Sequence, residues 1–326
     1  MNRSAIFSYG WKAALGAALM VYVSSLVNWG EVYDKFRAVP GVYFFLSLLV
    51  VLIQTVALGW RWQRIGLIDD IRIRVSSHVT ATLISLFFSQ GLPAFIGSDT
   101  FRIWWYSRHG IFPARGLKII TFDRVIGVVS LAAVCALGVA VMLSTGSDHV
   151  ILWPLVLGVG AAILGFCSLV LPFRTGLTEY LARLSRRLPN TPGKVLGWVI
   201  ETREFFRAGS AAGVMLILAT GVVIHLFTVL LGYVLALGLG STASYMDCLV
   251  AIAPVLLISY IPISIAGWGV REVSLVFTFS MVGVDKETAL LVSLGIGTTM
   301  LVVSLVGGAL WMISDMRRPE NKKLHQ

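Results

Sequence analysis

Two arginines stand within long apolar segments, where a charged side chain is unexpected. Arg102 follows the run QGLPAFIGSDTF, and Arg271 follows YIPISIAGWGV. A charge near the centre of a bilayer costs at least about 2.5 kcal/mol on insertion scales, so such a residue normally has a partner or a function. A guanidinium presents a planar fork of donors that suits phosphate and carboxylate oxygens. The two arginines are therefore candidate ligands for an anionic group.

Acidic residues accompany both arginines and allow a second interpretation. Asp99, Asp123 and Glu272 are the nearest counter-charges, so the arginines could instead form structural ion pairs or extend to the membrane interface. Asp123 and the adjacent Arg124 also fit a simpler role, as markers of the cytoplasmic end of a helix. Both interpretations are kept open at this point. The candidate binding residues are Arg102, Arg271, Asp99, Asp123, Arg124 and Glu272.

Proline and glycine precede the two arginines in a similar order. Pro93 stands nine residues before Arg102, and Pro262 stands nine residues before Arg271. Both residue types interrupt helices, so each run is predicted to form a turn at membrane depth. A broken helix presents free N–H groups and the positive end of its dipole, which favours an anion. The predicted turn residues are Pro93, Gly97, Pro262, Gly267 and Trp268.

The composition indicates that these segments lie in a membrane. Of the 326 residues, 57% are hydrophobic and only 13% are charged, whereas an average soluble domain has about 25% charged residues. Several uncharged stretches reach the length of about 18 residues that a helix needs to cross a hydrocarbon core. The N-terminus resembles a secretory signal without a small-residue cleavage site, so we expect a retained first helix. This pattern excludes a soluble enzyme domain.

The formal net charge of +10 is distributed unevenly, which predicts the topology rather than a nucleic-acid partner. Because cytoplasmic loops carry an excess of lysine and arginine, the basic segments are assigned to the cytoplasm. Both termini are then expected in the cytoplasm, and the protein in the cytoplasmic (inner) membrane as a multi-pass protein. With the N-terminus, the basic segments hold 20 of the 26 Lys and Arg residues; they are 60–76, 105–118, 173–209 and 314–326.

Two apolar segments have flanks that match in charge, which a single crossing would not give. Segment 79–104 is basic on both sides, while segment 248–282 is poor in positive charge on both sides. We therefore predict two re-entrant helical hairpins that enter from opposite faces of the membrane. The remaining apolar segments then alternate consistently as six transmembrane helices of an all-α integral membrane protein. These helices are predicted at 11–27, 40–59, 117–142, 150–172, 210–240 and 287–313.

The order of these elements predicts an inverted-topology repeat, the architecture of many secondary transporters. Residues 1–145 contain two helices, a hairpin and a helix, and residues 146–326 contain the same order with the opposite orientation. Segment 173–209, which is basic and has an apolar face, is expected to connect the repeats as an amphipathic helix on the cytoplasmic surface.

Neither cysteine nor histidine is spaced like a metal site. Cys135, Cys167 and Cys248 all lie in apolar segments without close spacing, and the five histidines are scattered. We therefore predict no metal and no cofactor.

Several motifs together resemble a known family. They are FFSQGLPAFIGSDTFRIWWYSRHG, GLKIITFDRVIGVVSL and YIPISIAGWGVREVSLVF, followed by a glycine-rich last helix. This pattern is similar to the transmembrane region of lysylphosphatidylglycerol synthase, also called the flippase-like domain family. The resemblance spans nearly the whole chain and rests on the elements LP-x₃-G-x-D-x₂-R, DR and GWG-x-RE.

The resemblance implies a lipid flippase fold without enzymatic activity. In bifunctional members this region is thought to move aminoacylated phosphatidylglycerol, while a separate cytoplasmic domain carries out the synthase reaction. The chain ends soon after its last apolar segment, so synthase activity is not expected. Stand-alone members occur near glycosyltransferase and hopanoid pathways, which leaves both a phospholipid and a prenyl-phosphate-linked lipid open as cargo.

The leading hypothesis is therefore a transporter that moves an anionic or zwitterionic lipid headgroup across the cytoplasmic membrane, with membrane lipids as its partners. One alternative is an accessory subunit of a lipid-modifying enzyme or a glycosyltransferase. Another is an intramembrane transferase that uses Asp99 or Glu272 as a base, although the sequence has no nucleophile motif or metal-binding acidic cluster that would support it.

Overall fold

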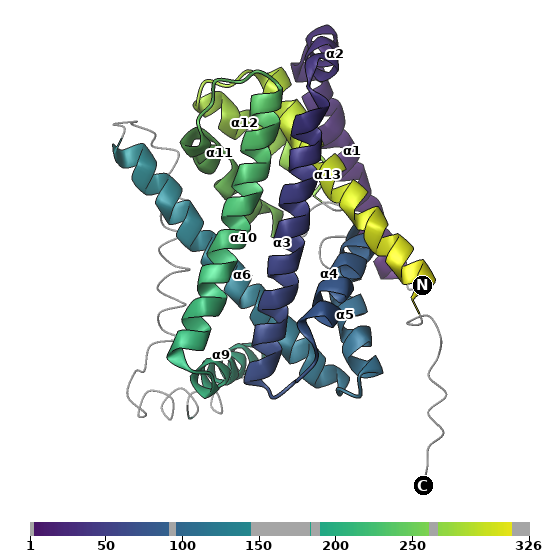
Figure 1. Ribbon diagram of the computed structural model, residues 1–326, viewed down its shortest axis with the longest axis vertical. Helices are drawn as coiled ribbons and strands as arrows, with labels where there is room; N and C mark the ends of the chain where they lie inside the picture. The colour runs from purple at the N-terminus through teal and green to yellow at the C-terminus, as the bar shows by residue number, and fades with distance from the viewer. Residues whose placement is uncertain (1–2, 91–95, 145–182, 184–189, 261–266, 315–326) are drawn as a thin grey trace.

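The computed structural model describes residues 3–90, 96–144, 183, 190–260 and 267–314. Within these residues every regular element is an α-helix (Figure 1). The helices are α1 (Arg3–Leu26), α2 (Trp29–Ala38), α3 (Gly41–Ile68), α4 (Val75–Gln90), α5 (Ile96–Arg108), α6 (Pro113–Ser144), α9 (Asn190–Ala208), α10 (Ala211–Gly238), α11 (Tyr245–Ser259), α12 (Val270–Met281) and α13 (Lys286–Ile313).

Four described helices, α3, α6, α10 and α13, are long and apolar enough to cross a membrane. A fifth span is possible if α1 and α2, which meet at a bend of 89°, are counted together. The prediction of an all-helical membrane protein is thus confirmed. The predicted helix 150–172 lies outside the described residues, so the full set of six spans is not described.

Two of the predicted boundaries were wrong. We expected a helix over 40–59 followed by a basic loop, but α3 continues to Ile68. The extra turns persist because Trp62 and Ile65 are fully buried against neighbouring helices. The segment 28–39, which lies between the predicted helices 11–27 and 40–59, contains a helix of its own, α2. Asn28 starts that helix by accepting a hydrogen bond from the N–H of Gly30, as a good N-cap residue does.

The two predicted hairpin segments each contain two short helices that pack on one another. α4 packs on α5, and α11 packs on α12. The first pair lies in the half of the molecule that contains α9, and the second lies in the opposite half (Figure 1). Pro93 and Pro262, the prolines predicted at the turns, lie outside the described residues.

The other predicted turn residues divide between a helix and a turn. Gly97 was placed wrongly, because it lies in the first turn of α5. Gly267 and Trp268 do lie in the turn that leads into α12. In that turn Gly267 and Gly269 have φ angles of +81° and +84°, which side chains rarely allow. A Cβ on Gly269 would also lie 2.5 Å from the carbonyl oxygen of Gly16, so glycine lets α1 approach.

The segment predicted as a connector, 173–209, contains α9. Residues 173–182 and 184–189 lie outside the described residues. In α9, Phe205 and Phe206 are buried and contact Phe122 of α6. These contacts hold α9 against the N-terminal half of α6.

Close contacts at glycine hold the first pair of helices in place. A Cβ on Gly59 of α3 would lie 2.7 Å from the backbone of Val79 in α4. A Cβ on Gly307 of α13 would lie 2.0 Å from the carbonyl oxygen of Leu83 in α4. Small residues allow such close packing of helices in membranes, where the hydrophobic effect does not drive association. α4 is therefore clamped between α3 and α13.

Candidate functional site

A cavity of about 340 Å³ lies between the two helix pairs and is lined by both Arg102 and Arg271. Its wall comes from α3, α4, α5, α6, α10, α11, α12 and α13, so segments far apart in the sequence meet there. Apolar side chains line part of the wall. The polar lining residues are Gln54, Arg61, Ser85, Ser89, Gln90, Ser98, Arg102, Asp123, Arg124, His225, Thr228, Ser259, Tyr260, Trp268 and Arg271.

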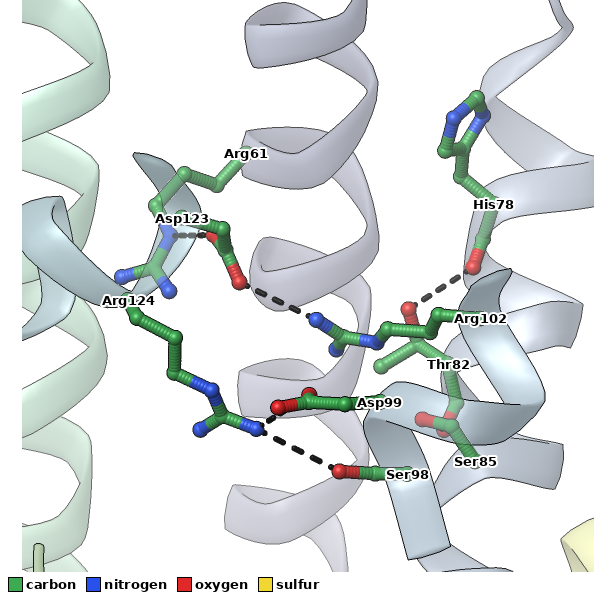
Figure 2. Close-up of polar contacts among 9 residues, drawn as sticks. All are labelled: Arg61, His78, Thr82, Ser85, Ser98, Asp99, Arg102, Asp123 and Arg124. Carbon is green, nitrogen blue, oxygen red and sulfur yellow. Dashed lines mark hydrogen bonds and ion pairs between the residues drawn. The ribbon is translucent and has the colours of Figure 1, made fainter. Parts of the chain in front are cut away.

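Asp123 of α6 joins two arginines from different helices. Nε of Arg61 donates to Oδ1 of Asp123 at 2.9 Å, and Nη1 of Arg102 donates to Oδ2 at 3.1 Å (Figure 2). The exposed fractions of Arg61, Arg102 and Asp123 are only 4%, 6% and 4%. One carboxylate therefore compensates two buried positive charges and links α3, α5 and α6.

Arg61 was not predicted from the sequence as a residue of the site. We had assigned it to a cytoplasmic basic segment because Arg64, Arg72 and Arg74 follow it closely. A signal was present, since Gln54, Leu58 and Arg61 have the spacing of one helix face and all three line the cavity. Continuing the helix beyond residue 59 would have revealed that face.

Arg124 forms a second ion pair beside the first. Its Nη2 lies 2.6 Å from Oδ1 of Asp99 and 3.4 Å from Oγ of Ser98, both in α5 (Figure 2). The side chains of Arg124 and Asp99 are each 27% exposed. Arg124 lines the cavity, whereas Asp99 is not among the lining residues. The pair is thus more open than the Asp123 cluster and connects α5 to α6.

Arg271 has a carboxylate from its own helix. Its Nη2 donates to Oε1 of Glu272 at 2.8 Å, and its Nε donates to Oγ of Ser293 at 3.2 Å. Glu272 is completely buried, does not line the cavity, and also accepts the N–H of Gly269 at 2.6 Å. Glu272 therefore caps α12 and holds Arg271 from behind, while Arg271 itself faces the cavity.

Each of the two predicted arginines also stacks on a tryptophan. The guanidinium carbon of Arg102 lies 4.7 Å from the ring centre of Trp62, and that of Arg271 lies 4.8 Å from the ring centre of Trp268. Such stacking stabilises a cation most when water is excluded. It also restricts the guanidinium to one orientation, which prepares it to bind a planar set of oxygens.

In the two arginines that pair with Asp123, two buried guanidinium nitrogens have no hydrogen-bond partner among the described residues. They are Nη1 of Arg61 and Nε of Arg102. A buried donor without an acceptor costs about 1–3 kcal/mol, so such groups call for an explanation. An anion bound in the cavity would supply acceptors close to this cluster.

Two further polar side chains close the wall around α6. Nε2 of His225 in α10 lies 3.0 Å from the carbonyl oxygen of Gly127. The hydroxyl of Tyr260, at the end of α11, lies so close to Gly127 that a Cβ there would be only 2.6 Å away. The second helix pair thus reaches the arginine cluster of the first. Within the described residues, no three His, Cys, Asp or Glu side chains gather in a way that could hold a metal ion.

The fold and cavity define a helical integral membrane protein with an arginine-lined site inside its apolar region. The family model of the lysylphosphatidylglycerol synthase transmembrane region matches residues 10–308, and the chain belongs to this family. No curated protein matches the chain. Membership of this family supports a function that concerns membrane lipids.

Proposed function

We propose that this protein is a lipid transporter that moves a phosphate-bearing headgroup across the cytoplasmic membrane through the cavity. The observation that carries the proposal is the meeting of Arg102 and Arg271 in one cavity, each fixed by a carboxylate and a tryptophan. A headgroup phosphate is the membrane-borne anion that a guanidinium fork fits best.

The cavity is suited to a ligand with one polar and one apolar end. The arginines and hydroxyl groups would bind the headgroup, and Leu86, Leu256 and Met300 offer apolar contacts for the start of the lipid chains. The rest of each chain would remain in the bilayer. Arg61 and Arg102 each have a donor available for the phosphate, so binding would need no break in their pairs with Asp123.

The positions of the helix pairs suggest how the site could open to each side in turn. One pair lies in each half of the molecule, and each contributes an arginine to the cavity (Figure 1). In an inverted repeat the two pairs would exchange open and closed conformations, as in other transporters of that architecture. The end of the molecule that contains α9 would then face the cytoplasm, because the sequence around α9 is rich in basic residues.

The test is transport in vesicles that contain only this protein. Purified protein is reconstituted, and transfer of a labelled phospholipid between leaflets is measured for the unchanged chain and for Arg102→Ala and Arg271→Ala. We expect a loss of about tenfold or more in each variant, because a charge-assisted phosphate contact is removed. Arg→Lys should restore less than the full rate, since lysine keeps the charge but loses the fork.

Arg64→Ala is the matched control. Arg64 is exposed outside the cavity, yet its guanidinium carbon also stacks 4.8 Å from a tryptophan ring centre, that of Trp60. The Arg64→Ala variant should transport the labelled phospholipid at the normal rate. Normal transport by well-folded Arg102→Ala and Arg271→Ala variants would refute the headgroup site. Absence of transport by the unchanged protein alone would favour an accessory subunit.

A further inference from the structure

We infer that α11 moves toward α6 during transport and closes on Gly138. The inference rests on the proposed transport function and identifies a helix contact that changes between its two conformations. It follows from a comparison of two equivalent helix interfaces, of which one is closely packed and the other is loose.

The interface between α4 and α13 has an equivalent between α11 and α6. α4 packs on α3 and α13, while α11 packs on α10 and α6. In the sequence, Arg271 follows Arg102 by 169 residues, and Gly307 of α13 follows Gly138 of α6 by the same interval. α6 and α13 also end 169 residues apart. In the proposed inverted repeat, Gly138 therefore corresponds to Gly307.

The interface of α4 with α13 is closely packed. A Cβ on Gly307 would lie 2.0 Å from the carbonyl oxygen of Leu83, and one on Gly308 would lie 2.7 Å from the ring of Phe87. A side chain at Gly307 would have to displace the backbone of α4. Glycine is thus required at this position by the conformation that the structure shows.

The interface of α11 with α6 is loose by comparison. Among the described residues, a Cβ on Gly138 would come no closer than 3.7 Å, to the carbonyl oxygen of Leu249 and Cα of Val250. This is an ordinary van der Waals distance, so the present packing does not require glycine, which is a poorer helix former than alanine. A void of about 10 Å³ lies at the same place. It is lined by Cys135, Gly138, Val139, Met142, Leu249, Val250, Ala253 and Pro254.

A closed form of this interface would account for both the glycine and the void. Displacements of about 1–2 Å are common where helices shift against one another. Such a movement of α11 would bring Leu249 nearly as close to Gly138 as Leu83 is to Gly307. It would also fill the void and restore the dispersion contacts that a gap forfeits. The structure then shows the conformation in which α4 is closed on α13 and α11 is open toward α6.

Pro254 gives α11 a place to bend. It lies inside the helix and lines the void. Proline has no N–H and cannot donate the helical hydrogen bond to the carbonyl oxygen of Val250, which favours a kink. Beyond Pro254, the residues Leu256, Ser259 and Tyr260 line the cavity. Movement of α11 toward α6 would therefore displace the wall of the cavity as well.

Gly138→Ala tests the inference in vesicles that contain the full chain, with labelled phosphatidylglycerol and phosphatidylethanolamine as probes. The added methyl group fits the open interface but obstructs the closed one. We expect transfer between leaflets to slow by about fivefold or more. The melting temperature of the purified variant should stay at or above that of the unchanged protein, because alanine favours a helix.

Two variants with the same chemical change are the controls. Gly307→Ala, at the closely packed interface, should melt at a lower temperature. Gly41→Ala, in the first turn of α3, should lower neither the melting temperature nor the transport rate. Among the described residues, nothing lies within 4 Å of a Cβ at Gly41.

Pro254→Ala tests the bend in α11. Alanine restores the helical hydrogen bond to Val250, so the stiffer helix should slow transfer by at least about threefold without lowering the melting temperature. Transfer at the normal rate would overturn the assignment of the bend to Pro254.

The failures of the two proposals can be told apart. If the Gly138→Ala protein is stable and transports at the normal rate, closure on Gly138 is refuted and lipid transport stands. A fall in melting temperature as large as that of Gly307→Ala would mean that the interface is already closed, and would also refute the inference. If the folded, unchanged protein moves neither probe above the protein-free background, both the closure and the transport function are overturned.

Discussion

The two helix pairs hold their arginines with the same parts but connect them differently. Arg102 of α5 and Arg271 of α12 each contact a carboxylate and a tryptophan ring. The carboxylate for Arg102 comes from another helix and is shared with Arg61, whereas that for Arg271 is the next residue in the chain. The first site is thus part of a network across three helices, and the second is confined mainly to one helix and its cap.

Because of this difference, we expect changes in the first network to affect mainly the stability of the protein, and changes at Arg271 to affect mainly the binding of its ligand. Removing a member of the shared network disturbs several helices at once, and the partners are nearly inaccessible to water. Arg271 has a side chain that is 12% exposed, so it retains access to the cavity. We expect the first pair to tolerate fewer changes than the second, which leaves the second freer to move with its ligand.

The largest effect is expected from Asp123→Asn. This variant leaves Arg61 and Arg102 buried without a counter-charge, and breaking a buried pair costs about 3–5 kcal/mol. Glu272→Gln should cost less, about 1–3 kcal/mol, because one arginine is left unpaired and glutamine keeps an acceptor for the N–H of Gly269. Thermal unfolding of both purified variants in the same detergent measures the difference. Equal destabilisation would contradict the contrast between network and local pair.

Gly297→Ala should have an effect of intermediate size, which lowers the transport rate more than the stability. A Cβ at this position of α13 would lie 2.5 Å from Nη2 of Arg271 and 2.8 Å from the Trp268 ring. Both are side-chain atoms that can shift, so we expect a small loss of stability, below about 1.5 kcal/mol, with a transport rate lowered by about fivefold or more.

Gly307→Ala is the control on the same helix. Its Cβ would meet the carbonyl oxygen of Leu83, which cannot move independently of α4. That variant should lose stability as well as transport. A Gly297→Ala protein with normal transport would show that the position of Arg271 is unimportant for function.

The smallest effect is expected at an ion pair outside the cavity, Lys35 with Asp285. The side chains are 31% and 49% exposed, and such pairs contribute about 0.2–1 kcal/mol. Burial acts to raise the pKa of Asp285, but hydrogen bonds from Lys35 and Thr288 outweigh it and hold the pKa below its usual value of 3.8. The contribution is therefore present above pH 4 and is lost as the pH falls through the lowered pKa.

The Asp285→Asn variant tests the small contribution that is expected from this ion pair. The variant should melt within a few degrees of the unchanged protein at neutral pH, and the difference should shrink further below pH 4. A loss as large as that of Asp123→Asn would mean that burial does not set the order of the effects.

The arginines and acids of the site were recognised from the sequence because a charge in an apolar segment needs a reason. Their partners were only partly recognised. From the sequence alone, either Asp99 or Asp123 could be the partner of Arg102, because both lie within reach along the chain. Arg61 was missed because its neighbours are also basic, and a count of charges cannot distinguish a buried guanidinium from a solvated one.

The sequence by itself determined what depends on composition and local order: a helical membrane protein, its family, and interruptions before Arg102 and Arg271. Only the tertiary structure decided which charges compensate one another and that both arginines line one cavity. The physical reason is that the energy of a buried charge depends on the distance to its counter-charge and on the exclusion of water. Those distances arise from the packing of α3, α5, α6 and α12, which lie up to about 200 residues apart in the chain.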